Sequence, residues 1–248
     1  MKVLLVTPAF TQPGGVSDFN RLLLKYSKSN ITTFILSTAG KEKGRLVRLF
    51  YGFGDVIRYI KALVIGKYYI VHLNPSLGQN AIKRDSLLTL IAKVMGRRVY
   101  IHWHGWNPSN EFLLQGRNKL YLKRTLFLAD HIKLLSPQFK NVLLTCGYNK
   151  TISIGNTFID DDFYNQHGTR RKHKDSLNIL FLSTVSRNKG IYTALDLYKT
   201  LIVNYPQVTL SIAGIGPEIE DVKNIVESIG NKKVKFLGYV LGTDKESA

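Results

Sequence analysis

The feature that most constrains the fold is a regular alternation of short apolar runs and amphipathic segments. Short apolar runs suit buried parallel strands, and intervening segments with helical spacing suit crossover helices. The predicted strands are 2–7, 31–36, 68–73, 98–103, 131–135, 151–154, 178–183, 208–213 and 234–238. The predicted helices are 16–28, 45–65, 83–95, 112–128, 138–146, 190–204 and 217–229. The fold class is therefore α/β with parallel sheets.

One polar segment without periodicity, His167–Asp175, interrupts the alternation. We interpret 167–176 as a linker between an N-terminal domain at 1–166 and a C-terminal domain at 177–248. The second domain has three predicted strands in about 70 residues, fewer than the ~100–150 residues common for a domain. Because the edges of so small a parallel sheet would be poorly covered, we expect the second domain to be incomplete.

The charge of the chain is unevenly distributed. Residues 1–175 hold 27 Lys and Arg against 10 Asp and Glu, a net charge of +17 within a total of +18. This asymmetry indicates an anionic partner, which could be nucleic acid, phospholipid or a phosphorylated substrate. The sequence has no nucleic-acid-binding motif, so we expect no nucleic-acid partner. It also has one cysteine and no apolar run of the ~20 residues that span a bilayer, so we expect a cytoplasmic location.

The segment 45–65 has two interpretations. Its apolar residues fall on one helical stripe, and its basic residues flank that stripe or face away from it. The stripe could face the core, or the helix could rest on anionic lipid, as a peripheral protein on the inner face of a membrane would. The stripe residues are Leu46, Leu49, Phe50, Phe53, Ile57, Ile60 and Val64.

A glycine pair separates the first predicted strand from the first predicted helix. The stretch QPGGVSDF contains Gly14 and Gly15 directly before an amphipathic run. The pair could simply make a tight turn. Alternatively, it lets another molecule approach the unpaired amides at the start of the helix, where an anion would be favoured.

Two histidines follow the fourth predicted strand, in the stretch VYIHWHGW. His102 and His104 are two residues apart, so both side chains project to the same side if the strand continues. They lie at a carboxyl end, where ligands of open α/β sheets bind. They could be structural, could orient or deprotonate a hydroxyl, or could ligate a metal. The last role lacks a convincing third ligand, and we predict no metal site.

The predicted C-terminal domain has two comparable turns, FLSTVSRNKG at 181–190 and AGIGPE at 213–218. In the first, Arg187 and Lys189 stand at a helix start, where two cations beside unpaired amides would bind a phosphate. In the second, Gly216 and Glu218 follow a strand and would face the same crevice. We therefore place Gly216 and Glu218, together with His102, among the residues that line this ligand-binding crevice.

Six motifs in order resemble family 4 of the glycosyltransferases. They are PGGV, HWHG, SIGNTFID at 153–160, SRNKG, AGIGPE and FLGYV at 236–240. The resemblance implies the GT-B fold, two Rossmann-like domains facing each other across a cleft. It also implies transfer of a sugar from a nucleotide-sugar donor to an acceptor hydroxyl, with retention at the anomeric carbon and no obligatory metal or other cofactor.

The resemblance implies a role for five residues. His104 would be the active-site histidine, and Gly14 and Gly15 would approach the donor. Lys189 would neutralise the diphosphate leaving group, where negative charge develops in the transition state. Arg187 would supply charge that the glycine-arginine of many members provides, because Ser183 and Thr184 occupy those positions here.

This sequence departs from the family's pattern at one motif. The family has two glutamates eight positions apart that hold the donor, and this sequence has no such pair after Gly216. We therefore keep two hypotheses. The main one is a membrane-associated enzyme of cell-envelope or surface polysaccharide assembly, acting on a saccharide or a lipid-linked saccharide. The alternative is a non-catalytic or remnant binding module without a complete donor site.

Overall fold

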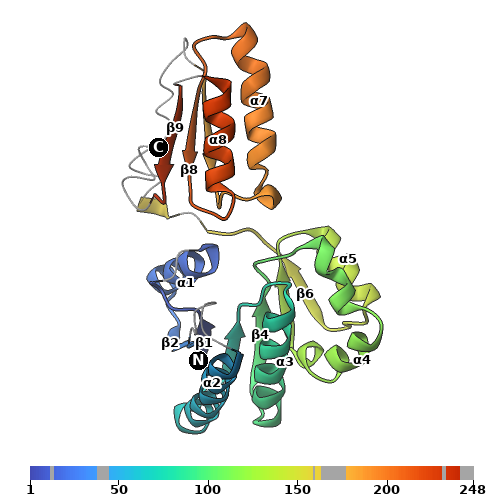
Figure 1. Cartoon of the computed structure of the whole chain (residues 1–248). Coiled ribbons are helices and arrows are strands. Elements are labelled where there is room, and N and C mark those ends of the chain that lie inside the picture. The colour runs from blue at the N-terminus through green and yellow to red at the C-terminus, as the bar shows by residue number, and fades with distance from the viewer. Residues whose placement is uncertain (12–13, 38–44, 159, 163–176, 231–232, 241–248) are drawn as a thin grey trace. The chain divides into compact units, whose positions relative to one another are not determined.

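The computed structural model describes residues 1–248 except 12–13, 38–44, 159, 163–176, 231–232 and 241–248, and it describes the backbone alone at 45–50. The chain forms two compact units, Met1–Asp160 and Asp161–Ala248 (Figure 1). The predicted linker at 167–176 lies almost entirely outside the described residues. The domain boundaries at 166 and 177 therefore stay a prediction.

The first unit is built on a six-stranded sheet in the order β2-β1-β3-β4-β5-β6, in which every pairing is parallel. The order reverses at β1, because the chain passes from β1 to β2 on one side and returns to β3 on the other. The strands are β1 (Lys2–Thr7), β2 (Asn30–Ile35), β3 (Ile70–Leu73), β4 (Arg98–His102), β5 (His131–Leu134) and β6 (Thr151–Ile154).

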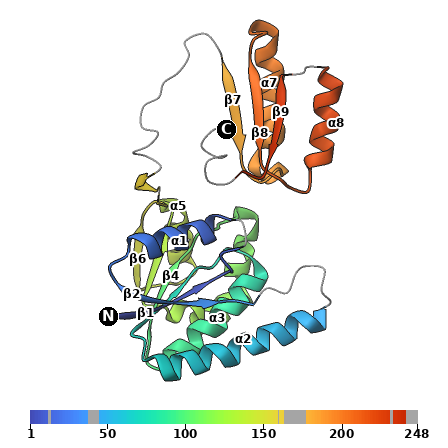
Figure 2. The ribbon, with the colours of Figure 1, turned by 90° about the vertical axis from the view of Figure 1, so that its left-hand side faces the viewer.

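Helices cover both faces of this sheet. Right-handed crossovers put α1, which leads to β2, on one face and α2 and α3, which lead in the opposite direction, on the other (Figure 2). The helices are α1 (Gly15–Tyr26), α2 (Arg45–Gly66), α3 (Gln79–Val94), α4 (Arg117–Lys123) and α5 (Pro137–Thr145).

The prediction of one continuous helix at 112–128 is wrong. The chain forms a short 3-10 helix η1 (Pro108–Leu114), then α4, then a second 3-10 helix η2 (Leu126–Leu128). Gly116 separates the first two with φ of +57°, which an α-helix cannot contain. The interruption matters because η1 and α4 together wall a cavity described below.

Helix α2 faces the core with a different side from the one predicted. Tyr59 and Leu63, one turn apart, are fully buried, whereas Phe53, Ile57 and Val64 are 67%, 53% and 60% exposed. The interpretation of the stripe as core-facing is therefore wrong for these three residues. The hydroxyl of Tyr59 donates to the carbonyl of Leu88 at 3.2 Å, so this side of α2 is tied to α3.

The second unit is a three-stranded parallel sheet in the order β7-β8-β9. Its own core includes Leu210 and Ile212 of β8, Leu195 of α7 and Val222 of α8. The elements are β7 (Asn178–Leu182), the 3-10 helix η3 (Arg187–Lys189), α7 (Ile191–Asn204), β8 (Thr209–Ala213), α8 (Ile219–Ile229) and β9 (Val234–Gly238). Two parallel sheets with crossover helices confirm the α/β fold class.

Candidate functional site

The first candidate site lies at the carboxyl edge of the six-stranded sheet, beside the point where the strand order reverses. Loops that follow β3 and β4 meet there. Ser76 and Gly105 form a parallel bridge, and the backbone amide of His104 donates to the carbonyl of Pro75. Ligands of open α/β sheets bind at such switch points, so this edge is the first place to seek a site.

His104 is held in one tautomer by Asn74, the residue after β3. The side-chain nitrogen of Asn74 donates to the carbonyl of Val6 at 3.0 Å. Because that carbonyl can only accept, the amide oxygen of Asn74 must face His104, whose Nε2 lies 2.9 Å away. His104 Nε2 therefore carries the proton, which leaves Nδ1 as a hydrogen-bond acceptor.

Phe19 connects α1 to the histidines. Its ring centroid lies 4.5 Å from the rings of His102 and His104, and 4.5 Å from Phe158, on which it stacks. Phe158 belongs to the SIGNTFID motif. Because Phe19 lies one turn after Gly15, these contacts bring the first turn of α1 to the same edge of the sheet as His104.

Gly14, directly before α1, and Gly15, its first residue, differ in how strictly the structure requires glycine. Gly14 has φ of +153°, a backbone conformation that favours glycine. Gly15 has no such φ, and a Cβ added there would meet no atom within 4 Å. Neither conformation nor packing within the described chain therefore requires glycine at position 15, and the space beside it is open to another molecule.

The histidines of this edge are neutral near pH 7. Burial, then repulsion from Lys133, lowers the pKa of His104 to about 4. Burial is also the first cause for His72 and His102, whose pKa values fall to about 3 and about 2. His102 is 1% exposed, and its ring packs 3.8 Å from that of His104. Its predicted place in the lining of a cleft stays a prediction.

No metal centre forms among the residues that the structure describes. Nowhere in them do three or more His, Cys, Asp or Glu side chains converge as a metal would require. A neutral imidazole with a free Nδ1 instead suits hydrogen bonding to a hydroxyl.

A small cavity of about 170 Å³ lies beside Asn74. Val6 of β1 and Val16 of α1 line it, together with an ion pair from α3. In that pair the Arg84 guanidinium donates to both carboxylate oxygens of Asp85, at 3.0 and 2.8 Å. The cavity joins the glycine turn to the residue that orients His104.

The second candidate site is in the other unit, where the turns after β7 and β8 pack together. A Cβ on Gly216 would lie 2.1 Å from the carbonyl oxygen of Val185, and one on Gly214 would lie 1.9 Å from that of Ser183. The backbone amide of Val185 donates to the carbonyl oxygen of Ile215 at 3.0 Å. Packing between the two turns therefore requires glycine at position 216.

The predicted phosphate-binding cations lie beside this pair of turns. Arg187 and Lys189 are exposed in η3, directly before α7. The Arg187 guanidinium packs 4.4 Å from the ring centre of Tyr192, in the first turn of α7. Glu218 immediately precedes α8, and its Oε2 is buried without a hydrogen-bond partner among the described atoms.

Three residues of the first site were missed by the sequence analysis. They are Asn74, Phe19 and Lys133, which respectively orient His104, pack on it and depress its pKa. Asn74 and Lys133 both stand near the carboxyl ends of strands that flank β4, and that position was the available signal. Phe19 carried none beyond its apolar spacing.

The comparisons with solved structures settle the fold. An E. coli trehalose-6-phosphate structure bound with UDP-2-fluoro glucose superposes with a TM-score of 0.64 at 12% identity, over 98% of this chain and 75% of that one. The chain has the GT-B fold. A UDP-GlcNAc 2-epimerase from Neisseria meningitidis bound to UDP-GlcNAc gives 0.58 at 15% identity, over all of this chain and 74% of that one. The GT-B fold that the motif-based resemblance implies is thus confirmed.

One curated relative matches almost the whole chain. It is the gpi3 subunit of phosphatidylinositol N-acetylglucosaminyltransferase from Schizosaccharomyces pombe, 26% identical over an alignment 246 residues long that covers 96% of this chain. The chain spans about half the length of that relative. No protein-family model matches the chain.

Proposed function

We propose that the chain acts in transfer of a sugar from a nucleotide-sugar donor to an acceptor hydroxyl, with retention at the anomeric carbon. The observation that carries this proposal is the orientation of His104 at the switch point of a GT-B sheet. The curated relative, named as an N-acetylglucosaminyltransferase, supports transfer over the epimerisation for which other proteins with this fold are named.

In this mechanism His104 acts as a neutral hydrogen-bonding group. Its Nδ1 accepts a hydrogen bond from a sugar hydroxyl and so orients the reacting ring. The bond from the anomeric carbon to the diphosphate oxygen breaks, and a bond to the acceptor oxygen forms as the acceptor hydroxyl passes its proton to the departing diphosphate oxygen. A pKa of about 4 keeps the imidazole uncharged, so it does not attract the leaving diphosphate away from its cations.

The cations for the diphosphate would be Arg187 and Lys189. Negative charge grows on the leaving group as the anomeric bond breaks, so fixed positive charge there stabilises the transition state more than the ground state. This arrangement would supply the neutralisation that a metal otherwise provides, and we propose a reaction with no obligatory metal or organic cofactor. The open space at Gly15 would admit the donor.

A comparison of two histidine variants tests this proposal. We expect His104→Ala to lower the transfer rate by about 10²–10⁴-fold. His131→Ala is the matched control, because His131 begins β5 at the opposite edge of the same sheet and bonds Ser153. Turnover that is equal in the two variants would remove His104 from the mechanism. Release of a C2 epimer in place of a glycosylated acceptor would overturn transfer itself.

We further propose that the chain works on the cytoplasmic face of a membrane, on a saccharide or lipid-linked saccharide of cell-envelope or surface polysaccharide assembly. The first unit carries most of the positive charge, and α2 exposes Phe53, Ile57 and Val64 to solvent. Apolar side chains on a helix of a basic unit suit the surface of an anionic bilayer. Among the described residues, no helix is both long and apolar enough to cross a bilayer.

Vesicle flotation tests the membrane part. We expect the double variant Phe53→Ser/Ile57→Ser to lose binding to anionic vesicles. The matched control, Leu197→Ser/Val203→Ser on α7, removes apolar side chains that are 51% and 76% exposed and should leave binding intact. Equal binding of the unmodified chain to neutral and anionic vesicles would contradict the proposal.

A further inference from the structure

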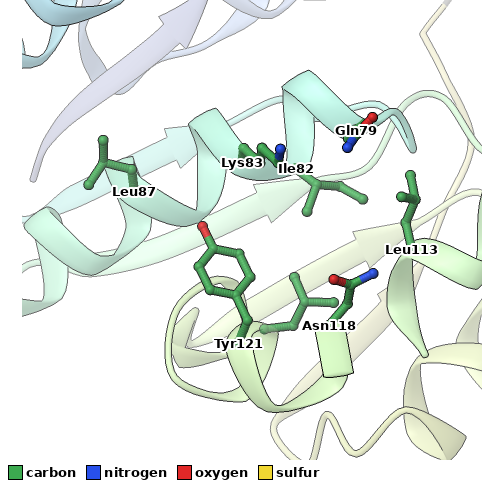
Figure 3. Close-up of a pocket in the computed structure, with 8 residues that line it drawn as sticks. Gln79, Ile82, Lys83, Leu87, Leu113, Asn118 and Tyr121 are labelled. Atoms are coloured by element: carbon green, nitrogen blue, oxygen red, sulfur yellow. The ribbon is translucent and has the colours of Figure 1, made fainter. Parts of the chain in front are cut away.

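A second, larger cavity lies on the α2–α3 side of the sheet, away from His104. Its volume is about 470 Å³, within the roughly 300–1,000 Å³ of small-molecule sites. Helix α3 forms one wall, and η1 and α4 form the other (Figure 3).

The cavity is an apolar slot. Ile82 and Leu87 of α3 line one wall, and Leu113 of η1 and Leu122 of α4 line the other. The remaining lining residues are Gln79, Lys83, Asn118 and Tyr121. From Gln79 to Leu87 the slot follows two turns of α3, about 12 Å. A saccharide would need several convergent polar groups, whereas a hydrocarbon chain needs only this elongated apolar surface.

Its mouth is positively charged. Lys83 lines the cavity. Arg117 lies one turn before Tyr121 on the same side of α4, and Arg124 directly follows that helix. The acidic residues of α3, η1 and α4 are Asp85, which is 1% exposed and paired with Arg84, and Glu111 of η1, which accepts a hydrogen bond from the Trp106 indole. An apolar slot with a cationic mouth is complementary to an apolar chain with an anionic head.

The slot is also joined to the histidine site. Helix α3 begins at Gln79, five residues after Asn74. The side chain of Asn110 in η1 donates to the carbonyl of Leu77 at 2.7 Å, so the connecting segment and the far wall are tied together. The Gln79 end of the slot therefore lies toward the edge of the sheet that holds His104, and the Leu87 end lies away from it.

We propose that the slot binds the hydrocarbon chain of a phosphate-bearing lipid, with the phosphate at Lys83, and that this lipid carries the acceptor sugar. The identification with the acceptor rests on the proposed function, but the binding of the lipid does not. Vesicle binding through α2 and chain binding in the slot are then separable properties.

Calorimetric titration of the whole chain with dodecyl phosphate, below its micelle concentration, tests the slot. We expect saturable binding that Leu87→Glu weakens by at least about tenfold, because an anion would lie beside the apolar chain, and that Lys83→Gln weakens by about threefold. Leu87 and Tyr121 are each 43% exposed, so Leu87→Glu and a second variant, Tyr121→Ser, should fold. Leu197→Glu and Lys199→Gln on α7 are the matched controls and should bind normally.

Two further ligands separate chain from head. Dodecyltrimethylammonium has the same chain with the opposite charge, and inorganic phosphate has the head alone. We expect both to bind at least tenfold more weakly. The proposal that the slot binds a phosphate-bearing lipid would be overturned if dodecyltrimethylammonium bound as tightly as dodecyl phosphate. Unchanged dodecyl phosphate binding in both Leu87→Glu and Tyr121→Ser would overturn it as well.

Retained dodecyl phosphate binding in His104→Ala separates the two proposals, since the slot does not need the histidine. Retained binding in Phe53→Ser/Ile57→Ser, alongside lost vesicle flotation, would show that the lipid chain is held in the slot and not by the bilayer surface. Loss of dodecyl phosphate binding in this double variant would overturn the slot as a separate site.

Discussion

His104 Nε2 lies 2.9 Å from Asn74 Oδ1, and Asn74 is itself fixed by the carbonyl of Val6. These two hydrogen bonds join the loop after β4, the loop after β3, and β1, the strand where the sheet order reverses. The carbonyl of β1 thus decides which nitrogen of the histidine holds its proton, and hence which nitrogen can accept from a ligand.

Asn74→Ala should release this control. We expect nitrogen NMR shifts to show His104 with a proton mainly on Nε2 in the unmodified chain and a mixture of tautomers in the variant. Transfer should fall by about tenfold or more, and unfolding should become easier by about 1–3 kcal/mol because the Val6 carbonyl loses its donor. An unchanged tautomer in the variant would contradict the orientation by Asn74.

Stability should decline as pH falls from 6.5 to 5. In that range the unfolded chain protonates histidines with ordinary pKa values near 6.5, whereas folded His72, His102 and His104 stay neutral. The unfolded state therefore binds more protons than the folded state. The free energy of unfolding consequently rises with pH and falls on acidification. Each histidine contributes a slope of up to about 1.4 kcal/mol per pH unit below pH 6.5.

Chemical denaturation at several pH values measures this slope, and His104→Asn provides the comparison. The variant should lose one histidine's share of the dependence. A free energy of unfolding that stays flat between pH 6.5 and 5 would show that the three rings are not kept neutral by their surroundings.

Gly15→Ala should separate binding from folding. A Cβ at this position meets nothing within 4 Å, so we expect stability to hold or to rise by a few tenths of a kcal/mol. Donor affinity should fall by about tenfold because the methyl group occupies the approach to the helix amides. Gly52→Ala, at another uncrowded glycine in α2, is the control and should leave donor affinity unchanged.

Gly216→Ala should have the opposite effect. Its Cβ would lie 2.1 Å from the carbonyl oxygen of Val185, so the turn after β8 must separate from the turn after β7. We expect a loss of about 1–3 kcal/mol in the stability of the second unit, seen as faster amide hydrogen exchange in β7 and β8. Exchange as slow as in the unmodified chain would contradict this role.

The sheets could be predicted from the sequence because their information is local. The apolar runs at 2–7, 98–103 and 151–154 match β1, β4 and β6 to within one residue at each end. Parallel pairing follows from the helices between them. The fold class and the GT-B resemblance depend on these elements and not on distant contacts.

The partner of His104 could not be predicted, because Asn74 is 30 residues away and carries no motif. The sequence also did not allow us to predict which side of α2 is buried. The buried residues Tyr59 and Leu63 lie outside the predicted apolar stripe, and which side of the helix is buried depends on where α3 packs. The proline at 108 and glycine at 116 were local signals for the break before α4, but a count of apolar spacing alone did not include them.

Titration of the chain with nucleotide sugars, UDP-GlcNAc and UDP-glucose first, tests the central claim most directly. We predict saturable binding that Lys189→Ala weakens by about tenfold and that Lys199→Ala, a matched exposed lysine on α7, leaves unchanged. A non-catalytic module without a donor site would bind neither sugar nucleotide. That result, or equal affinity in the two lysine variants, would contradict the account.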